Sequence, residues 1–525
     1  MIEGENAQEG DMPGMLGLTA VGKDNYGGAA LIEVLPHGRG KAITAAHCLK
    51  YDLNTVRVRG GSLEWNNGGY QATVKEYFIN PAYALPAGID MAVLVLDGVP
   101  ADAQTAPTLA GPADEALYEV GSDVTIFGWG PTKINGKNPT LLQKGTLPLV
   151  EPGSCNLEDR TSNAAFACCK AVNGRQSSPG DSGGPVISGA DGNRRLVAVV
   201  EGGRNSESIG TRVDMQLAWI QNPTGVRSIV VGSRPMAVAA GADGRKYVAH
   251  ASEAYLTDKR DGAPGSLSVF NNDWTLSGTI AAGNPSAVAV SAATGMVYVA
   301  DRPNNTVSMI DPATSQVVGA PIVLKSIPSG LVLTANSSRL YVLNGKSVTI
   351  LDAADLRTVQ SIKPETGPTV IAAAPDGARV YVANEDDGEI TVIDTATSSV
   401  AATWDTGNYG NPSIVAAADR VYVGSTGREV YVLGLNGRQS EGIKISEFRA
   451  VKSLALAGTD LFVGYETTNS SNLPQVGVQI FSSQVGVGPR TLELGGAPLA
   501  GLVSTPAGEV LAVNRDVSSI SIVHP

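Results

Sequence analysis

Hydrophobic and polar residues alternate in short runs through the second half of the chain, and one run recurs at a regular interval. Period-2 alternation broken by Asp, Asn and Gly turns is typical of short antiparallel strands. The recurring segments are RKYVAH, MVYVAD, RLYVLN, RVYVAN, RVYVGS, DLFVGY and VLAVNR, anchored at Tyr247, Tyr298, Tyr341, Tyr381, Tyr422, Phe462 and Ala512. The anchors are 40 to 51 residues apart, close to the roughly 40–45 residues of a four-stranded propeller blade. The pattern therefore predicts seven blades after about residue 224.

The two ends of this region predict that the blades close into a ring. The last unit stops at ISIVHP after three strands, whereas TGVRSIVVGSRP, residues 224–235, has the pattern of an isolated fourth strand. A strand from the front that completes the final blade would leave no open sheet edge. The pattern resembles the YVTN-type seven-bladed β-propellers over nearly all of residues 224–525. An open β-solenoid, the competing interpretation, fits the displaced fourth strand less well.

The first 223 residues do not share this period. Apolar strand patterns occur at KAITAA, MAVLVL, DVTIFGWG and RLVAVV, separated by glycine-rich connections, and VDMQLAWIQ has helical spacing. We expect an all-β domain with a C-terminal helix over residues 1–223, followed by the propeller over residues 224–525. Two domains also suit a chain of 525 residues.

Composition narrows the classes of partner. A net charge of −12 provides no basic stripe for nucleic acid or an anionic membrane surface. No apolar run is long enough to cross a bilayer, and the segment MIEGENAQEG lacks the basic and apolar regions of a signal peptide. These features predict either a cytosolic chain or an exported one whose leader is not part of the sequence.

Candidate chemistry centres on SSPGDSGGPV, residues 177–186, where Ser182 is either a nucleophile or a turn residue. A serine nucleophile needs an imidazole to take its proton and a carboxylate to orient that imidazole. The chain has only four histidines, namely His37, His47, His250 and His524. His47 ends an apolar strand, yet an isolated histidine is more often structural than catalytic.

Three motifs in order change this balance. AITAAHC, GIDMAVLVL and PGDSGGPV resemble the histidine, aspartate and serine motifs of the trypsin-like, chymotrypsin-fold serine peptidases, and IFGWG and GTRVDMQLAWI match further landmarks. The resemblance covers residues 2–222 and implies a fold of two β-barrels. It implies Ser182 as nucleophile, His47 as general base and acid, and Asp90 as the orienting carboxylate. It also implies an oxyanion hole made by the N–H groups of Gly180 and Ser182.

The start of the chain resembles the mature start of that family. The resemblance implies a buried ion pair between a free ammonium on Ile2 and the carboxylate of Asp181, which organises the oxyanion hole. Met1 would block this pair. We therefore expect a zymogen-like activation, in which removal of a leader or propeptide frees Ile2; a plain strand role for Ile2 is the alternative.

Other positions depart from the family pattern. Cys48 lacks its usual partner and is expected to be a free buried thiol, and Ser178 stands where a further half-cystine is usual. The remaining family disulfide implies that Cys155 pairs with Cys168 or Cys169. The resemblance implies that Gln176 stands at the base of the primary specificity pocket, in place of an aspartate.

The wall of that pocket also differs, because the usual Ser-Trp-Gly is replaced by the segment from Glu201 to Gly203. A neutral base disfavours a desolvated cation, although Glu201 could supply a carboxylate nearby. We expect a non-basic side chain before the scissile bond.

The main hypothesis is a secreted serine endopeptidase acting on proteins or peptides, with a propeller that binds substrate or a partner. Low lysine with high alanine and glycine suits a bacterial exported protein. The alternative is a binding protein with an inactive peptidase-like domain, whose propeller holds a protein or carbohydrate ligand. No cluster has the spacing of metal ligands, so no metal and no cofactor are expected.

Overall fold

The computed structural model describes most of the chain and divides it into two compact units. It describes residues 1–525 except 23, 84–87, 156–162, 204–206, 224, 253–264, 365–366, 385–387, 407–412, 425–428, 441, 446–449, 469–473, 483–488, 496–498 and 525. The first unit comprises Met1–Val230 and Glu493–Gly496, and the second comprises Val231–Leu492 and Ala497–Pro525. Residue 224, where the second predicted domain begins, lies outside the described residues.

Six antiparallel strands form a closed barrel at the start of the first unit. They are β2 (Met15–Thr19), β3 (Asn25–Leu35), β4 (Arg39–Thr44), β5 (Arg57–Gly60), β6 (Tyr70–Ile79) and β7 (Ala92–Asp97). β2 pairs with β3 and β5, β4 pairs with β3 and β7, and β6 pairs with β5 and β7, so no strand edge stays open.

A second barrel of six strands follows in the same unit. It consists of β8 (Asp123–Gly128), β9 (Gln143–Val150), β10 (Phe166–Lys170), β11 (Pro185–Ser188), β12 (Arg195–Gly202) and β13 (Glu207–Arg212). The pairings run β8–β9–β10–β13–β12–β11 and return to β8. Along β9, buried and more exposed residues alternate, as expected for a strand with one face on the core. A short strand, β1 (Glu5–Asn6), pairs with the edge of β9.

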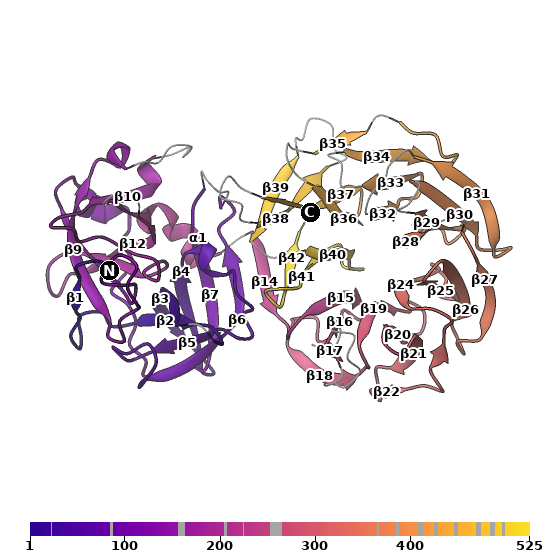
Figure 1. Cartoon of the computed structure of the whole chain (residues 1–525), viewed down its shortest axis with the longest axis horizontal. Helices are drawn as coiled ribbons and strands as arrows, with labels where there is room; N and C mark the ends of the chain where they lie inside the picture. The colour runs from indigo at the N-terminus through magenta and orange to yellow at the C-terminus, as the bar shows by residue number, and fades with distance from the viewer. Residues whose placement is uncertain are drawn as a thin grey trace. The chain divides into compact units, whose positions relative to one another are not determined.

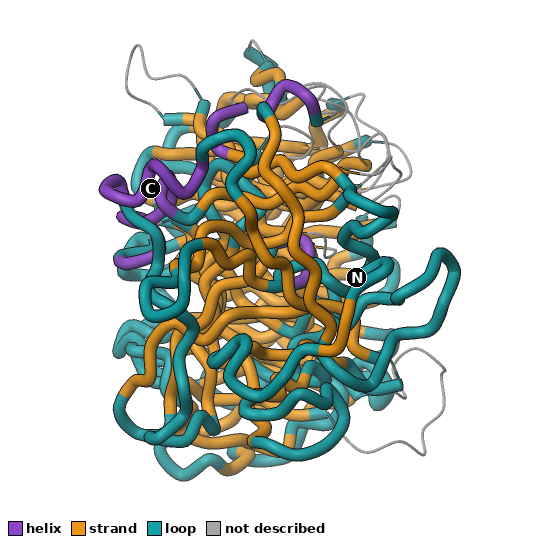
Figure 2. The backbone as a smooth tube through the Cα atoms, turned by 90° about the vertical axis from the view of Figure 1, so that its left-hand side faces the viewer, coloured by secondary structure: helices purple, strands orange, loops and turns teal. Residues whose placement is uncertain are grey.

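A helical segment follows the barrels, where VDMQLAWIQ predicted one. It consists of a 3₁₀ turn at Asp214–Gln216 and α1 (Leu217–Gln221), with Ile220 fully buried in the barrel core. Figure 2 shows how strands dominate the described backbone while helical turns stay few and short. The predicted all-β, two-barrel fold with a C-terminal helix is confirmed. Within the described ranges, no helix combines the length and apolar character needed to span a membrane.

The second unit is a ring of sheets (Figure 1). The first three sheets are β15 (Pro235–Ala240), β16 (Lys246–His250), β17 (Ser266–Phe270) and β18 (Leu276–Ala281); β19 (Pro285–Val290), β20 (Val297–Asp301), β21 (Thr306–Asp311), β22 (Gln316–Val317) and β23 (Ile322–Val323); and β24 (Pro328–Leu333), β25 (Arg339–Asn344), β26 (Ser347–Asp352) and β27 (Thr358–Ile362). The next three are β28 (Pro368–Ala373), β29 (Arg379–Asn384), β30 (Glu389–Asp394) and β31 (Ser399–Asp405); β32 (Ser413–Ala416), β33 (Arg420–Gly424), β34 (Glu429–Gly434) and β35 (Ile443–Lys444); and β36 (Ala450–Ala457), β37 (Asp460–Thr468), β38 (Pro474–Phe481) and β39 (Arg490–Gly495).

Three further strands complete the propeller-like ring. β40 (Leu499–Ser504), β41 (Val510–Asn514) and β42 (Ser519–Val523) follow the six sheets, and β40 contacts both β36 and β15. The ring therefore has six sheets of four or five strands and a seventh position filled by these three strands. Part of the segment that was predicted to close the ring, residues 224–235, forms strand β14 (Val226–Val230). Directly after β14, the N–H of Val231 donates to the carbonyl of Ser518 at 3.0 Å.

Burial within each sheet explains the repeating sequence. The Tyr-Val segments form the second strand of their sheets, and those strands are almost wholly buried, as in β25 and β29. The outermost strands β18 and β27 are mostly exposed. Apolar side chains of adjacent sheets share one core, for example Tyr341 and Leu343 of β25 with Val380 and Val382 of β29. Each sheet is therefore stabilised by its neighbours.

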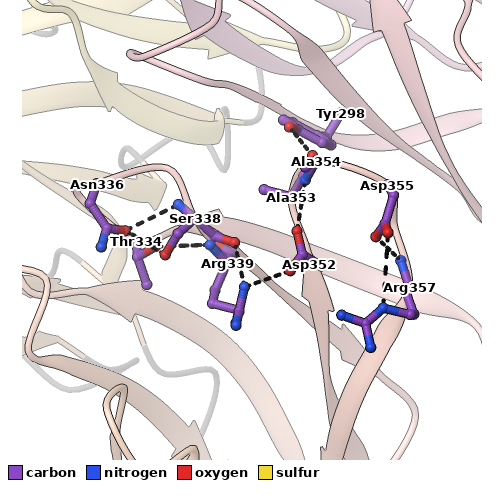
Figure 3. Close-up of polar contacts among 10 residues, drawn as sticks. All are labelled: Tyr298, Thr334, Asn336, Ser338, Arg339, Asp352, Ala353, Ala354, Asp355 and Arg357. Carbon is purple, nitrogen blue, oxygen red and sulfur yellow. Dashed lines mark hydrogen bonds and ion pairs between the residues drawn. The ribbon is translucent and has the colours of Figure 1, made fainter.

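Hydrogen bonds also link neighbouring sheets. The hydroxyl of Tyr298 on β20 donates to the carbonyl of Ala353, beyond the end of β26, at 2.6 Å (Figure 3). The turn that presents this carbonyl is held by Asp352, which accepts from the N–H of Ala354 at 3.1 Å and from Arg339 at 2.8 Å. Because Tyr298 is only 2% exposed, this bond replaces one that water would otherwise make.

We predict that Tyr298→Phe lowers the free energy of unfolding by about 1 kcal/mol, because it leaves the Ala353 carbonyl without its donor. Tyr381→Phe is the matched control. Tyr381 occupies the same place on β29, yet its buried hydroxyl has no hydrogen-bond partner among the described residues. Its loss should change stability by less than about 0.5 kcal/mol. Denaturant unfolding of the two variants would make the comparison, and equal losses would contradict the prediction.

Candidate active site

The pairing of two strands brings the imidazole and its carboxylate together. β4 pairs with β7 so that Thr44 lies opposite Ala92. His47 lies in the 3₁₀ turn that follows β4, and Asp90 lies two residues before the start of β7. His47 Nδ1 and Asp90 Oδ2 lie 2.5 Å apart, and the backbone N–H of His47 donates to Asp90 Oδ1 at 3.0 Å. Asp90 is 1% exposed. Each of its two carboxylate oxygens contacts His47, one at the ring and one at the backbone.

This pairing controls the protonation of His47. Burial lowers the pKa of the imidazole, but the charge and hydrogen bond of Asp90, together with those of Cys48, outweigh burial and raise the pKa well above its ordinary value of 6.5. The hydrogen bond at Nδ1 directs the other ring nitrogen, Nε2, away from the carboxylate. That nitrogen lies 3.9 Å from the thiol of Cys48.

Ser182 comes from the second barrel, in the loop that leads into β11. Its carbonyl accepts from the N–H of Gly28 on β3 at 2.8 Å, which ties the loop to the first barrel. Its hydroxyl donates to the carbonyl of Glu201 at 3.4 Å, and among the described residues no hydrogen bond joins it to His47. Ser182 and His47 nevertheless line the same pocket, which has a volume of about 290 Å³.

Two backbone N–H groups around Ser182 are available as donors. Gly180 has a φ of +99° and Gly183 a φ of +79°, a left-handed region that glycine adopts at little cost. In the part of the chain that the structure describes, the N–H groups of Gly180 and Ser182 have no protein acceptor. Two adjacent free N–H groups beside a hydroxyl suit an anionic oxygen.

Several residues of this pocket were missed by the sequence analysis. Its wall includes the aromatic rings of Tyr26 and Tyr51, whose centres are 4.4 Å apart, together with Lys50 and Asn138. These residues follow separate strands and turns, and they carry no spacing signal that would group them. Of the pocket residues, the sequence predicted only His47, Cys48, Gly180 and Ser182.

The three residues expected to set specificity do not line that pocket. Gln176 is half-buried and its backbone pairs with Ile2. Glu201 contributes the carbonyl that accepts from Ser182. A Cβ on Gly203 would lie 2.8 Å from the hydroxyl of Ser177, and Ser177 donates to Gly202 at 3.2 Å. Residues 204–206, which follow Gly203 in the sequence, lie outside the described residues.

Comparisons with known proteins cover the first unit. A family model described as Trypsin matches residues 1–220. A trypsin of Saccharopolyspora erythraea is 30% identical over 210 residues, spanning 39% of this chain and 86% of that protein. The chain belongs to the trypsin family. A trypsin of Phaedon cochleariae is 32% identical over 197 residues, or 35% of this chain and 74% of that protein. Trypsin Blo t 3 of Blomia tropicalis is 27% identical over 236 residues, or 42% and 85%.

The trypsin-family unit holds a buried amino terminus, but not the one that the sequence predicted. The ammonium of Met1, not that of Ile2, lies 2.6 Å from Asp181 Oδ2, and both groups are fully buried. Met1 also donates to the hydroxyl of Ser178 at 2.8 Å. The backbone of Ile2 is engaged with Gln176 through bonds of 2.9 and 3.3 Å, so it is the preceding residue that reaches Asp181.

The environment of Met1 perturbs its terminal ammonium. Burial lowers the pKa of this group below its ordinary value of 8.0, against the opposing attraction of Asp181. The Met1 side chain packs in the core of the second barrel with Val124, Leu147 and Val186. In this structure Met1 supplies the ammonium of the buried pair with Asp181, and the pairing of a freed Ile2 ammonium with Asp181 stays a prediction.

The disulfide is settled by strand geometry. Cys155 is bonded to Cys168, and Cys169 is a free, buried thiol. Successive side chains on a strand point to opposite faces, so Cys168 packs with Cys155 while Cys169 packs in the barrel core beside Ala167. Burial raises the pKa of Cys169 to about 12.

Cys48 is also free and buried, as expected. In the described part of the chain, no three His, Cys, Asp or Glu side chains could together hold a metal ion.

We predict that the His47 imidazole titrates above pH 6.5 and that Asp90→Asn lowers this pKa, because the negative partner is removed. A raised pKa means that the pair stabilises the fold fully below pH 6.5 and loses this contribution as the pH rises through the folded value. Titration of the histidine resonances by NMR measures both. His250, whose pKa burial lowers, is the internal control and should not respond to Asp90→Asn. Titration of wild-type His47 at or below 6.5 would contradict the assignment.

We predict that one glycine added before Met1 destabilises the chain, because it removes the buried ammonium opposite Asp181. Leaving a buried charge unpaired costs about 3–5 kcal/mol. The same extension should cost much less in an Asp181→Asn background, where no carboxylate remains to be paired. Unfolding by denaturant measures the four proteins, and an equal loss in both backgrounds would show that steric clash, not charge, is responsible.

Proposed function

We propose that this trypsin-family chain is a serine endopeptidase that hydrolyses proteins or peptides. The observation that carries the proposal is the arrangement around one pocket: His47 bonded to Asp90, beside Ser182 and two free N–H groups. A purely structural loop has no need of a buried carboxylate aligned on a partly exposed imidazole. The inactive-domain alternative has no observation in its favour.

The proposed reaction proceeds through an acyl-enzyme. Ser182 Oγ attacks the carbonyl carbon of the scissile bond while His47 Nε2 takes the hydroxyl proton. The oxygen of the tetrahedral intermediate accepts from the N–H groups of Gly180 and Ser182, where a donor is worth roughly 10²–10³-fold in rate. His47 then gives the proton to the leaving nitrogen, and the C–N bond breaks. A water molecule, deprotonated by His47, releases the second product and restores Ser182.

Asp90 has a positioning role in this scheme. It binds the proton on Nδ1 and so keeps Nε2 free to act as the base, and its charge stabilises the imidazolium. The bond from the Ser182 hydroxyl to Glu201 belongs to the substrate-free state, in which catalytic hydrogen bonds are often long or misaligned. Rotation about the Cα–Cβ bond of Ser182 redirects this hydroxyl without moving the backbone.

Specificity and context complete the proposal. Gln176 offers an amide where a carboxylate would select Lys or Arg, so we propose a preference for a non-basic residue before the scissile bond. Fluorogenic peptides that differ only in Leu or Arg at that place test this preference.

We further propose that the chain has two domains, residues 1–223 and 224–525. The second is a propeller of the YVTN type that binds substrate or a protein or carbohydrate partner. We also propose that the protein is exported from a bacterial cell.

The first experiment is labelling with a fluorophosphonate probe, which reports an activated serine without any assumption about specificity. We predict that the wild-type chain is labelled, that Ser182→Ala is not, and that Asp90→Asn reacts roughly 10⁴-fold more slowly, because His47 loses the correct tautomer. Ser154→Ala, at an exposed serine of the same unit, is the control and should label like wild type. Labelling that survives in Ser182→Ala would refute the proposed nucleophile.

A further inference from the structure

The first unit contains a second and larger cavity, which shares no residue with the pocket of Ser182 and His47. Its volume is about 810 Å³, within the roughly 300–1,000 Å³ of ligand sites. The walls come from three stretches distant in sequence, residues 9–15, 61–70 and 100–104, and from Leu141 and Leu142. We call it the acidic cavity.

One wall of the acidic cavity is held rigidly by its own hydrogen bonds. Within the loop of residues 61–70, Ser62 Oγ donates to the carbonyl of Asn67 at 2.7 Å and accepts from the N–H of Glu64 at 3.0 Å. Arg59 donates to the carbonyls of Trp65, at 3.1 Å, and of Gly68. The cavity is therefore preformed, which lowers the entropy cost of binding a ligand there.

The same loop is anchored to the second barrel. Leu63 accepts at its carbonyl from the N–H of Leu142 at 2.8 Å and from the indole N–H of Trp129 at 3.0 Å. Trp65 donates from its own indole to the carbonyl of Pro139 at 3.1 Å. These bonds fix both Leu63 and Leu142 in the cavity lining.

The lining combines apolar surface with negative charge. Its apolar part comes from Met12, Met15, Leu63, Tyr70, Leu141 and Leu142. Leu141 is 38% exposed and presents apolar surface at this lining, whereas Met12, Met15 and Leu142 are buried. Three carboxylates, those of Glu9, Glu64 and Asp102, share the lining with no lysine or arginine.

These carboxylates have no countercharge within the described structure. None of the three forms an ion pair there, and the guanidinium groups of Arg59 and Arg194, which contact this wall, donate to backbone carbonyls. Lys144 binds the carboxylate of Asp11 at 2.8 Å, and Arg194 donates to the carbonyls of Gly10 and Asp11. The cavity therefore carries a net negative charge beside an apolar surface, and its electrostatic complement is a cation attached to apolar groups.

We propose that the acidic cavity binds a short peptide segment in which Lys or Arg is flanked by apolar side chains. Its cationic group pairs with the carboxylates, and its apolar neighbours cover Leu141, Leu63 and Tyr70. The site lies apart from Ser182, so this binding does not depend on the proposed peptidase activity. In the full chain it gives a second point of attachment for a protein with a basic segment.

The test uses the full chain with Ser182→Ala, so that a bound peptide is not cut. The probe is fluorescein-labelled Ala-Leu-Arg-Leu-Lys-Leu-Ala amide, and its partner has glutamine in place of Arg and Lys. Fluorescence anisotropy measures the dissociation constant. We expect saturable binding of the basic peptide, at least about tenfold weaker binding of the glutamine peptide, and loss of affinity at high ionic strength.

Matched variants locate the binding. Glu9→Gln, Glu64→Gln and Asp102→Asn together should raise the dissociation constant at least tenfold. Glu119→Gln, Asp123→Asn and Asp191→Asn remove the same charge from exposed positions of the same unit outside the cavity lining, and they should change it less than twofold.

The apolar contribution has its own variant. Leu141→Ser should weaken the binding of the basic peptide several-fold without any change in charge. Equal effects of the two charge variants would mean diffuse attraction to an acidic protein, and would overturn the proposal. Absence of saturable binding to the wild-type lining would overturn it as well. Because the glutamine and asparagine side chains keep the size of those they replace, thermal unfolding of each variant should match that of the parent chain.

Discussion

The buried carboxylate of Asp181 determines the conformation of the whole loop around Ser182. Asp181 is 0% exposed and accepts from the ammonium of Met1, from the N–H of Gly130 at 2.8 Å and from the N–H of Ser178 at 2.8 Å. A carboxylate removed from water is tolerated only with such partners. Because Asp181 lies directly between Gly180 and Ser182 in sequence, holding it orients the two N–H groups and the hydroxyl together. A Cβ on Gly128 or Gly130 would lie 2.2 or 2.8 Å from the Asp181 side chain, so two glycines leave room for the charge.

The loop around Ser182 also links the two barrels. His47 and Asp90 are brought together within the first barrel by β4 and β7, whereas Ser182 belongs to the second. Their meeting depends on close backbone approach, since the N–H of Gly28 donates to the carbonyl of Ser182. A Cβ on Gly28 would lie 3.0 Å from the Cα of Gly184. Backbone packing therefore brings the loop of Ser182 against the first barrel.

The second unit is stabilised differently, because each of its sheets buries its apolar side chains mainly against the sheets beside it. Buried second strands and exposed outer strands repeat around the ring, so the same apolar pattern is needed in every unit. This repetition leaves few chemically distinctive side chains, whereas the first unit concentrates them in two cavities. One cavity holds the proposed nucleophile, and the other holds unpaired carboxylates beside apolar surface.

Short motifs in the sequence were sufficient to identify the trypsin-like unit, the repeating sheets and the candidate residues His47, Asp90 and Ser182. They were sufficient because local patterns carry strand periodicity, glycine turns and the chemistry of each side chain. Three features needed the tertiary structure. The partner of Cys155 is Cys168 because adjacent residues of β10 face opposite sides. Met1 rather than Ile2 reaches Asp181 because the backbone of Ile2 is bonded to Gln176. The acidic cavity exists only where four separate segments meet, and the packing of distant segments against one another leaves no trace in the spacing of residues along the chain.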